Sequence, residues 1–171
     1  MLFRSPRKLD IEGIESPKVL SYIDVLKNKK QVGKRVAVIG AGGIGFDTAE
    51  YLSHEGDSGS LNPEKFYDEW GIDTTYSNVG GLKTAKVEES PREIYLLQRK
   101  ESSVGGGLGK TTGWIHRTGL KHRNVKMIAG VGYDKIDERG LHITVNDHPT
   151  FLEVDNIVIC AGQESYTAMY E

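Results

Sequence analysis

Uninterrupted runs of apolar residues separate the helical patterns of this chain, and they predict buried strands. Each run is short, rich in β-branched residues and lacks alternation, which is typical of central strands in a parallel sheet. Between them, apolar residues recur at helical spacing. The expected strands are residues 35–39, 93–98, 125–128 and 157–160, and the expected helices are 43–53 and 110–123.

The period changes to two after residue 130. Apolar positions then alternate with polar ones in three stretches between 131 and 154. The stretches are separated by turn-forming clusters at 137–140 and 146–149. This pattern predicts an antiparallel β-meander inserted before the last buried strand. The fold class predicted is therefore α/β: a Rossmann-like, three-layer nucleotide-binding domain with a parallel sheet and a meander.

Other stretches fit less simply into this order. Residues 1–15 resemble an extended arm, and Ser16-Pro17 predicts the start of a helix over 17–28. Residues 54–91 mix glycine, serine, asparagine and charge, and they predict a large insertion that folds back on the domain. Within it, Asn62-Pro63 predicts a short helix around 63–70.

Glycine is the residue type in surplus, with 21 among 171 residues. One glycine cluster follows the first strand directly and opens the first helix, which is the context that a dinucleotide-binding loop requires. In such a loop the helix N-terminus and the free N–H groups bind pyrophosphate. An ordinary strand-to-helix turn is the alternative. The predicted pyrophosphate-binding residues are Gly40, Ala41, Gly42, Gly43, Ile44 and Gly45.

The end of the second strand carries basic rather than acidic residues. In Rossmann-like folds an acid there binds the 2′-OH of NAD, whereas an arginine accommodates the 2′-phosphate of NADP. Gln98, Arg99 and Lys100 occupy this place, so NADP(H) is the preferred cofactor. A merely solvated strand end is the alternative. Lys110 and Arg117, on the next helix, are further candidates for the same phosphate.

Four other residues invite a functional interpretation. Ala161 and Gly162 follow the last strand and leave room for the cofactor at the carboxyl edge of the sheet. Cys160 is expected to pack as a small apolar residue. Trp114 is expected to pack rather than to stack on a cofactor.

Charge and composition exclude several classes of protein. The chain has 22 Lys and Arg against 24 Asp and Glu, so no basic footprint suggests a nucleic acid partner. No apolar stretch is long enough for a membrane span, and no signal peptide is visible, so a cytoplasmic location is expected. The single cysteine excludes a cysteine-built metal or iron–sulfur site within this chain, and no metal site is predicted.

The pattern resembles the nucleotide domains of two-dinucleotide-binding flavoproteins. More specifically, the chain resembles the bacterial NADPH-dependent 2,4-dienoyl-CoA reductases, which are iron–sulfur flavoproteins related to old yellow enzyme. The similar stretches are residues 17–26 (PKVLSYIDVL), 38–49 (VIGAGGIGFDTA), 69–73 (EWGID), 97–100 (LQRK), 107–117 (GLGKTTGWIHR) and 159–164 (ICAGQE).

This resemblance implies that the chain is the NADPH-binding domain of a longer reductase of unsaturated acyl-CoA. Residues 1–30 and 161–171 would then be parts of a flanking FAD domain, and 31–160 the NADP(H)-binding domain with its insertion at 54–91. FAD, FMN and a 4Fe-4S cluster would belong to the rest of the parent chain, and its FAD domain and flavin barrel would be the partners. No catalytic residue is expected here, and the isolated chain should not turn over. A regulatory or assembly module with a degenerate, empty nucleotide fold is the alternative.

Overall fold

The computed structural model describes residues 4–165, and its centre is a five-stranded sheet in which every neighbouring pair is parallel. The strand order β2-β9-β3-β4-β5 puts the first predicted strand in the middle. The strands are β2 (Val19–Ser21), β9 (Asn156–Ile159), β3 (Arg35–Ile39), β4 (Glu93–Leu97) and β5 (Lys126–Ile128). The predicted parallel sheet is confirmed.

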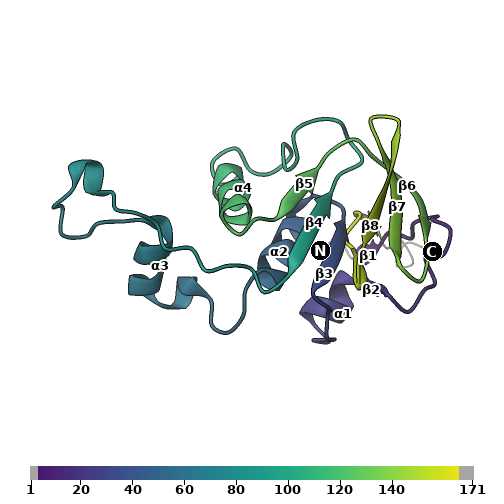
Figure 1. The fold of residues 1–171 in the computed structure, drawn as a ribbon, viewed down its shortest axis with the longest axis horizontal. Helices are drawn as coiled ribbons and strands as arrows, with labels where there is room; N and C mark the ends of the chain where they lie inside the picture. The colour runs from purple at the N-terminus through teal and green to yellow at the C-terminus, as the bar shows by residue number, and fades with distance from the viewer. Residues whose placement is uncertain (1–3, 166–171) are drawn as a thin grey trace.

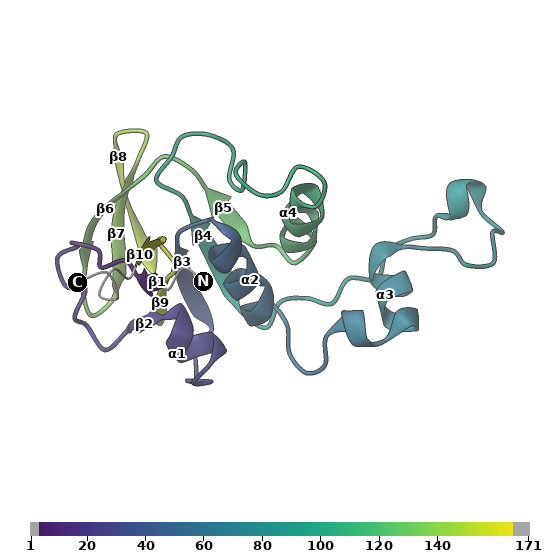
Figure 2. The ribbon, with the colours of Figure 1, turned by 180° about the vertical axis from the view of Figure 1, so that it is seen from behind.

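Helices cover one face of this sheet and the meander covers the other (Figures 1 and 2). Alternate residues of β3 enter two separate cores, as the pleat of a strand requires. Val36 and Val38 pack with the helices, whereas Ala37 and Ile39 pack with the meander. The helices are α1 (Tyr22–Leu26), α2 (Gly43–Leu52) and α4 (Gly113–His122), and the meander strands are β6 (Val131–Ile136), β7 (Gly140–Val145) and β8 (His148–Glu153). The predicted three layers are thus confirmed.

The helix predicted over 17–28 is wrong in its first part. Residues 19–21 instead form β2, which pairs with β9 at the edge of the sheet. The helix α1 begins directly after β2, at Tyr22, where Ser21 and Asp24 cap each other. The Asp24 amide donates to Ser21 Oγ at 3.1 Å, and the Ser21 amide donates to Asp24 Oδ2 at 3.0 Å. Pairing with the sheet has overridden the weaker start signal at Ser16-Pro17. Similarly, α4 begins at Gly113, three residues later than expected.

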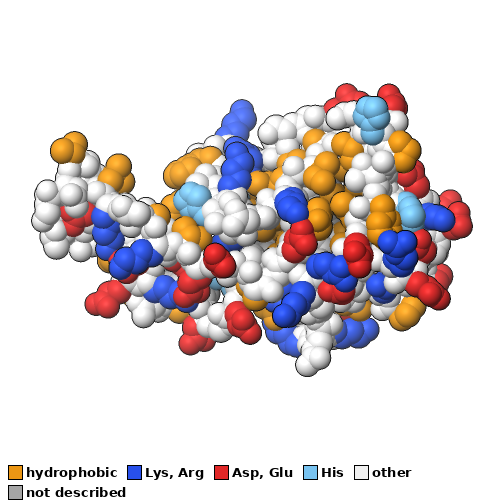
Figure 3. Space-filling model, viewed as in Figure 1, with side chains coloured by type: hydrophobic (Ala, Val, Ile, Leu, Met, Phe, Trp, Pro, Cys, Tyr) orange, Lys and Arg blue, Asp and Glu red, His pale blue; other side chains and the backbone are white. Residues whose placement is uncertain are grey.

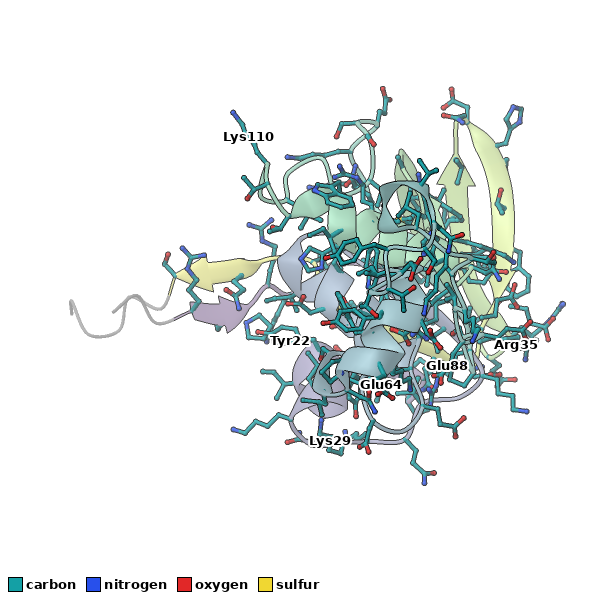
Figure 4. All side chains as sticks on the ribbon, turned by 90° about the vertical axis from the view of Figure 1, so that its left-hand side faces the viewer. Tyr22, Lys29, Arg35, Glu64, Glu88 and Lys110 are labelled. Atoms are coloured by element: carbon teal, nitrogen blue, oxygen red, sulfur yellow. The ribbon has the colours of Figure 1, made fainter. Side chains whose placement is uncertain are left out.

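The two ends of the described chain meet in a separate ribbon. Strand β1 (Arg4–Pro6) pairs antiparallel with β10 (Gln163–Ser165). Gln163 Nε2 donates to the Tyr22 hydroxyl at 3.2 Å, which ties the ribbon to α1. Figure 4 shows this ribbon as a purple and a yellow arrow at one side of the body. The domain boundaries at 30 and 161 stay a prediction, and residues 166–171 lie outside the described part.

Residues 54–91, called the arm below, project from the body instead of folding back on it (Figure 1). The arm contains η1 (Gly59–Leu61), α3 (Pro63–Trp70) and η2 (Val79–Gly81). The predicted helix at 63–70 is confirmed, with the Lys65 amide donating to Asn62 Oδ1 at 3.1 Å. Helix α3 buries no residue. The arm therefore lacks buried apolar side chains around this helix that would hold it against the body. Figure 3 shows apolar side chains at the outer end of the arm.

The base of the arm is fixed to the body by one buried arginine. Arg123, at the end of α4, is only 6% exposed. Its guanidinium donates to Glu69 Oε1 at 3.0 Å and to the carbonyl oxygens of Ser53 and Glu88 at 3.2 and 3.4 Å. Arg123 therefore joins α4 to the end of α2 and to both sides of the arm.

The tip of the arm is held by one carboxylate, that of Asp73. The hydroxyl and amide of Thr75 donate to Asp73 Oδ1 at 2.6 and 2.9 Å, and the amide and side chain of Asn78 both donate to Oδ2 at 2.9 Å. These hydrogen bonds lower the pKa of Asp73 to about 2, and the one from the Thr75 hydroxyl contributes most.

We expect the order of this tip to depend on pH. Because the folded pKa lies below the ordinary value of 3.8, the hydrogen bonds stabilise the loop fully above that pH and stop doing so as the pH falls through about 2. NMR shifts of the Thr75 and Asn78 amides should titrate with a midpoint near 2, and should not titrate there in an Asp73→Asn variant. A wild-type midpoint near 4 would contradict the assignment.

No helix within residues 4–165 is long and apolar enough to span a membrane.

Candidate functional site

The loop between β3 and α2 has the geometry of a phosphate-binding turn. Gly40 has a φ of 108°, and its amide donates to the Leu97 carbonyl at 2.9 Å. A Cβ on Gly40 would stand 2.6 Å from the Cys160 carbonyl oxygen, and a Cβ on Gly45 would overlap the Gly40 carbonyl oxygen. These two positions need glycine because β3, β9 and α2 come together here.

Next to these contacts, the opening turn of α2 is free. The helix begins after Gly42, which offers no side-chain cap. A Cβ at Gly42 or Gly43 would meet nothing within 4 Å. No side chain caps the first amides of α2, and together with the positive end of the helix these amides form a ready anion site.

This space is part of a cavity of about 910 Å³ at the carboxyl edge of the sheet. Its size lies in the range of cofactor sites. Ten of the predicted site residues line it, contributed by the ends of three neighbouring strands: Gly40, Ala41, Gly42, Gly43, Ile44, Gln98, Arg99, Lys100, Ala161 and Gly162. Gly45 lies beneath the loop, where α2 packs against the strand.

At the end of β4, Gln98 has a structural task. Its side-chain Nε2 donates to the carbonyls of Ser102 and Lys100 at 2.7 and 3.0 Å, and its Oε1 accepts from the Gly105 amide at 3.3 Å. Gln98 therefore holds the loop that presents Arg99 and Lys100 to the cavity. A contact between Gln98 itself and a cofactor stays a prediction.

Lys110 and Arg117 are not brought to the cavity. The guanidinium of Arg117 donates to the Gly105 carbonyl at 3.0 Å and so supports the loop after β4 from behind. Lys110 points outward from its loop in Figure 4. Contact of either residue with a 2′-phosphate stays a prediction.

Of the two other residues singled out in the sequence, one behaves as expected. Cys160 is 5% exposed, its thiol donates to the Thr48 hydroxyl at 3.5 Å, and burial raises its pKa to about 11. The thiol is therefore protonated at neutral pH and packs as expected. Trp114 is 55% exposed, so the expectation that it packs is wrong; its indole Nε1 donates to the Thr111 carbonyl at 3.0 Å.

Sequence reasoning missed the basic residues that the N-terminal segment brings to the cavity. Arg4, Arg7 and Lys8 line it, although they are far from the glycine loop in the chain. Only the pairing of β1 with β10 places them there, and no local pattern reveals such a pairing. With Arg99 and Lys100 they make five basic residues in the lining that residues 4–165 contribute, against one acid, Asp10. In a chain with a net charge of −2, the cavity is thus locally positive and attracts anions.

Comparison with known proteins agrees with this geometry. A family model described as pyridine nucleotide-disulphide oxidoreductase matches residues 4–171. A metal reductase of Desulforamulus reducens is 22% identical over 162 residues, which are 92% of this chain and 22% of the reductase. A cinnamate reductase of Clostridium sporogenes is 48% identical over 52 residues, which are 30% of this chain and 8% of that protein.

A solved structure of 2-naphthoyl-CoA reductase with 2-naphthoyl-CoA also resembles the chain, with a TM-score of 0.70 and 21% identity. The likeness covers 96% of this chain and 20% of the reductase, and at this identity it concerns the fold. The chain spans about a fifth or less of the length of these three proteins.

Proposed function

The chain belongs to the pyridine nucleotide-disulphide oxidoreductase family, and we propose that it binds NADP(H) and presents it to a flavin held by another part of a longer oxidoreductase. The observation that carries this proposal is the pair of basic residues, Arg99 and Lys100, which line the cavity at the end of β4. A carboxylate in this place would repel a 2′-phosphate, whereas a guanidinium binds it with two parallel hydrogen bonds.

The residues present fit such a cofactor. The open space at Gly42 and Gly43 leaves room for a pyrophosphate against the first amides of α2. Ala161 and Gly162, at the end of β9, leave room for the other half of the dinucleotide. The cofactor supplies a hydride when bound; the residues of this chain bind and orient it and neutralise its phosphates, and none of them needs to act as an acid or a base.

For the longer protein, we propose a reductase of unsaturated CoA thioesters, similar to 2,4-dienoyl-CoA reductase. The resemblance of residues 107–117 and 69–73 to that family supports this, as does a 2-naphthoyl-CoA reductase among the solved relatives. FAD, FMN and a 4Fe-4S cluster would reside in its other domains, which would be the partners of this chain. The whole protein would be cytoplasmic.

The NADP preference is tested with two mononucleotides that differ by one phosphate. We expect 2′,5′-ADP to bind the chain more tightly than 5′-AMP, by about 10- to 100-fold, because hydrogen bonds to a charged group contribute about 1.5–3 kcal/mol. An Arg99→Ala variant should lose most of this difference and keep its affinity for 5′-AMP. Isothermal titration calorimetry measures both.

Two results would count against the proposal. Equal affinity of the wild-type chain for the two mononucleotides would exclude the NADP preference. An unchanged preference in Arg99→Ala would assign the 2′-phosphate to another basic residue; Lys100→Ala would then test the neighbour that also lines the cavity, and Lys110→Ala and Arg117→Ala the two bases outside its lining. If no adenine dinucleotide raises the melting temperature, the chain is a module with an empty nucleotide fold.

A further inference from the structure

The ribbon of β1 and β10 brings an arginine to the end of the cavity opposite Arg99. The Arg7 amide donates to the Gly162 carbonyl at 3.2 Å, which fixes the backbone of Arg7 beside the end of β9. The guanidinium carbon of Arg7 lies 3.9 Å from where a Cβ of Gly162 would stand. The guanidinium therefore lies over Gly162, and Arg7 lines the cavity.

The order of the strands defines what lies next to Arg7. Strand β3, with the glycine loop at its end, has β4 on one side and β9 on the other. Along the carboxyl edge the sequence of groups is thus Arg99, the glycine loop, Gly162 and Arg7. A dinucleotide with its 2′-phosphate at Arg99 and its pyrophosphate on the glycine loop extends its second half over β9, toward Arg7.

The guanidinium of Arg7 is available for this contact. Among residues 4–165, the acid that pairs with it is Glu164, with Nε and Oε1 3.8 Å apart, and the two side chains are 50% and 61% exposed. Such an exposed and long pair contributes little. A phosphate or carboxamide oxygen of a ligand can therefore take the place of Glu164 at small cost.

We propose that Arg7 binds the nicotinamide mononucleotide half of the cofactor, by donating hydrogen bonds to its oxygen atoms. This inference rests on the proposed function and adds a residue on the opposite side of the glycine loop from the 2′-phosphate. The two arginines thus have separate tasks: Arg99 selects the phosphorylated ribose, and Arg7 holds the half that carries the nicotinamide ring.

The tasks of Arg7 and Arg99 can be distinguished with two ligands: NADP⁺, which contains both halves of the dinucleotide, and 2′,5′-ADP, which contains the adenosine half alone. We expect Arg7→Gln to weaken binding of NADP⁺ about tenfold, because a charge-assisted hydrogen bond is lost. The same variant should bind 2′,5′-ADP, which lacks the nicotinamide half, within twofold of wild type. Arg99→Ala should weaken both ligands. Calorimetry gives the affinities, and the melting temperature of each free variant shows whether it is folded.

Arg139→Gln is the matched control, because Arg139 lies in the turn of the meander and its guanidinium stacks on Phe151 outside the cavity. It should change neither affinity. Glu164→Gln removes the competing carboxylate and should leave NADP⁺ binding equal or tighter. If Arg7→Gln is folded and weakens both ligands equally, or neither, Arg7 does not bind the nicotinamide half, while the proposed function stands. If wild type binds neither ligand, both proposals fail.

Discussion

A Gly45→Val variant is expected to lose detectable binding of NADP⁺. The added Cβ would overlap the carbonyl oxygen of Gly40, and the Leu96 side chain lies 3.6 Å from it. The glycine loop must then shift, and the amides proposed to bind the pyrophosphate shift with it. Losing two hydrogen bonds to a charged group corresponds to about 3 kcal/mol or more, and hence to at least about 100-fold in affinity.

Calorimetry with NADP⁺ measures the loss, and circular dichroism shows whether the variant remains folded. Gly119→Ala is the matched control, since a Cβ at this position within α4 would meet nothing within 4 Å. It should bind NADP⁺ as wild type does and unfold at a slightly higher temperature, because alanine favours a helix more than glycine does. Wild-type affinity in Gly45→Val would show that the loop does not hold the pyrophosphate.

Replacing Arg123 by methionine is expected to lower the free energy of unfolding by about 3–5 kcal/mol, because Glu69 would be left as a buried charge without its partner. The side chains of Arg123 and Glu69 are only 6% and 13% exposed. The carbonyls of Ser53 and Glu88 would lose their donor as well. Such a change is a large part of the 5–15 kcal/mol that stabilises a typical domain.

Urea denaturation measures the change in free energy, and hydrogen exchange at 63–72 shows whether the base of the arm opens first. Lys65→Met tests an ion pair in the same arm, with Glu88 at 3.1 Å and side chains 29% and 53% exposed. It should cost less than about 1 kcal/mol. If Arg123→Met and Lys65→Met lower the free energy of unfolding equally, the buried Arg123–Glu69 pair does not contribute more than the exposed Lys65–Glu88 pair. Adding Glu69→Met to Arg123→Met should recover part of the loss.

The layers of the fold could be predicted because local pattern and tertiary environment agree there. The run at 35–39 is apolar on both faces, and in the structure Val36 and Ala37 are both fully buried, one in each core. The alternation after residue 130 gave the meander for the same reason. Where a local signal and a distant partner compete, as at 17–28, the distant partner prevailed: β9 pairs with 19–21.

The candidate site divides in the same way. The glycine loop and Arg99 follow directly from strand ends, so their place at the cavity could be predicted from the sequence. Arg7 could not, because its place depends on a strand pair between the two ends of the described chain. The sequence predicts a packed Trp114 within a helix over 110–123, but α4 begins only at Gly113, and the indole is exposed in its first turn.

The ribbon of β1 and β10 also has a consequence for the order of folding. Its three residue pairs join the most distant parts of the described chain, from Arg4 with Ser165 to Pro6 with Gln163. Contacts of such sequence separation are slow to form, since a long loop must close before they contribute. The glycine loop and the end of β4 can therefore form before β1 has paired with β10. We thus expect the part of the cavity at the glycine loop and Arg99 to form early in folding, and the part at Arg7 to be completed last.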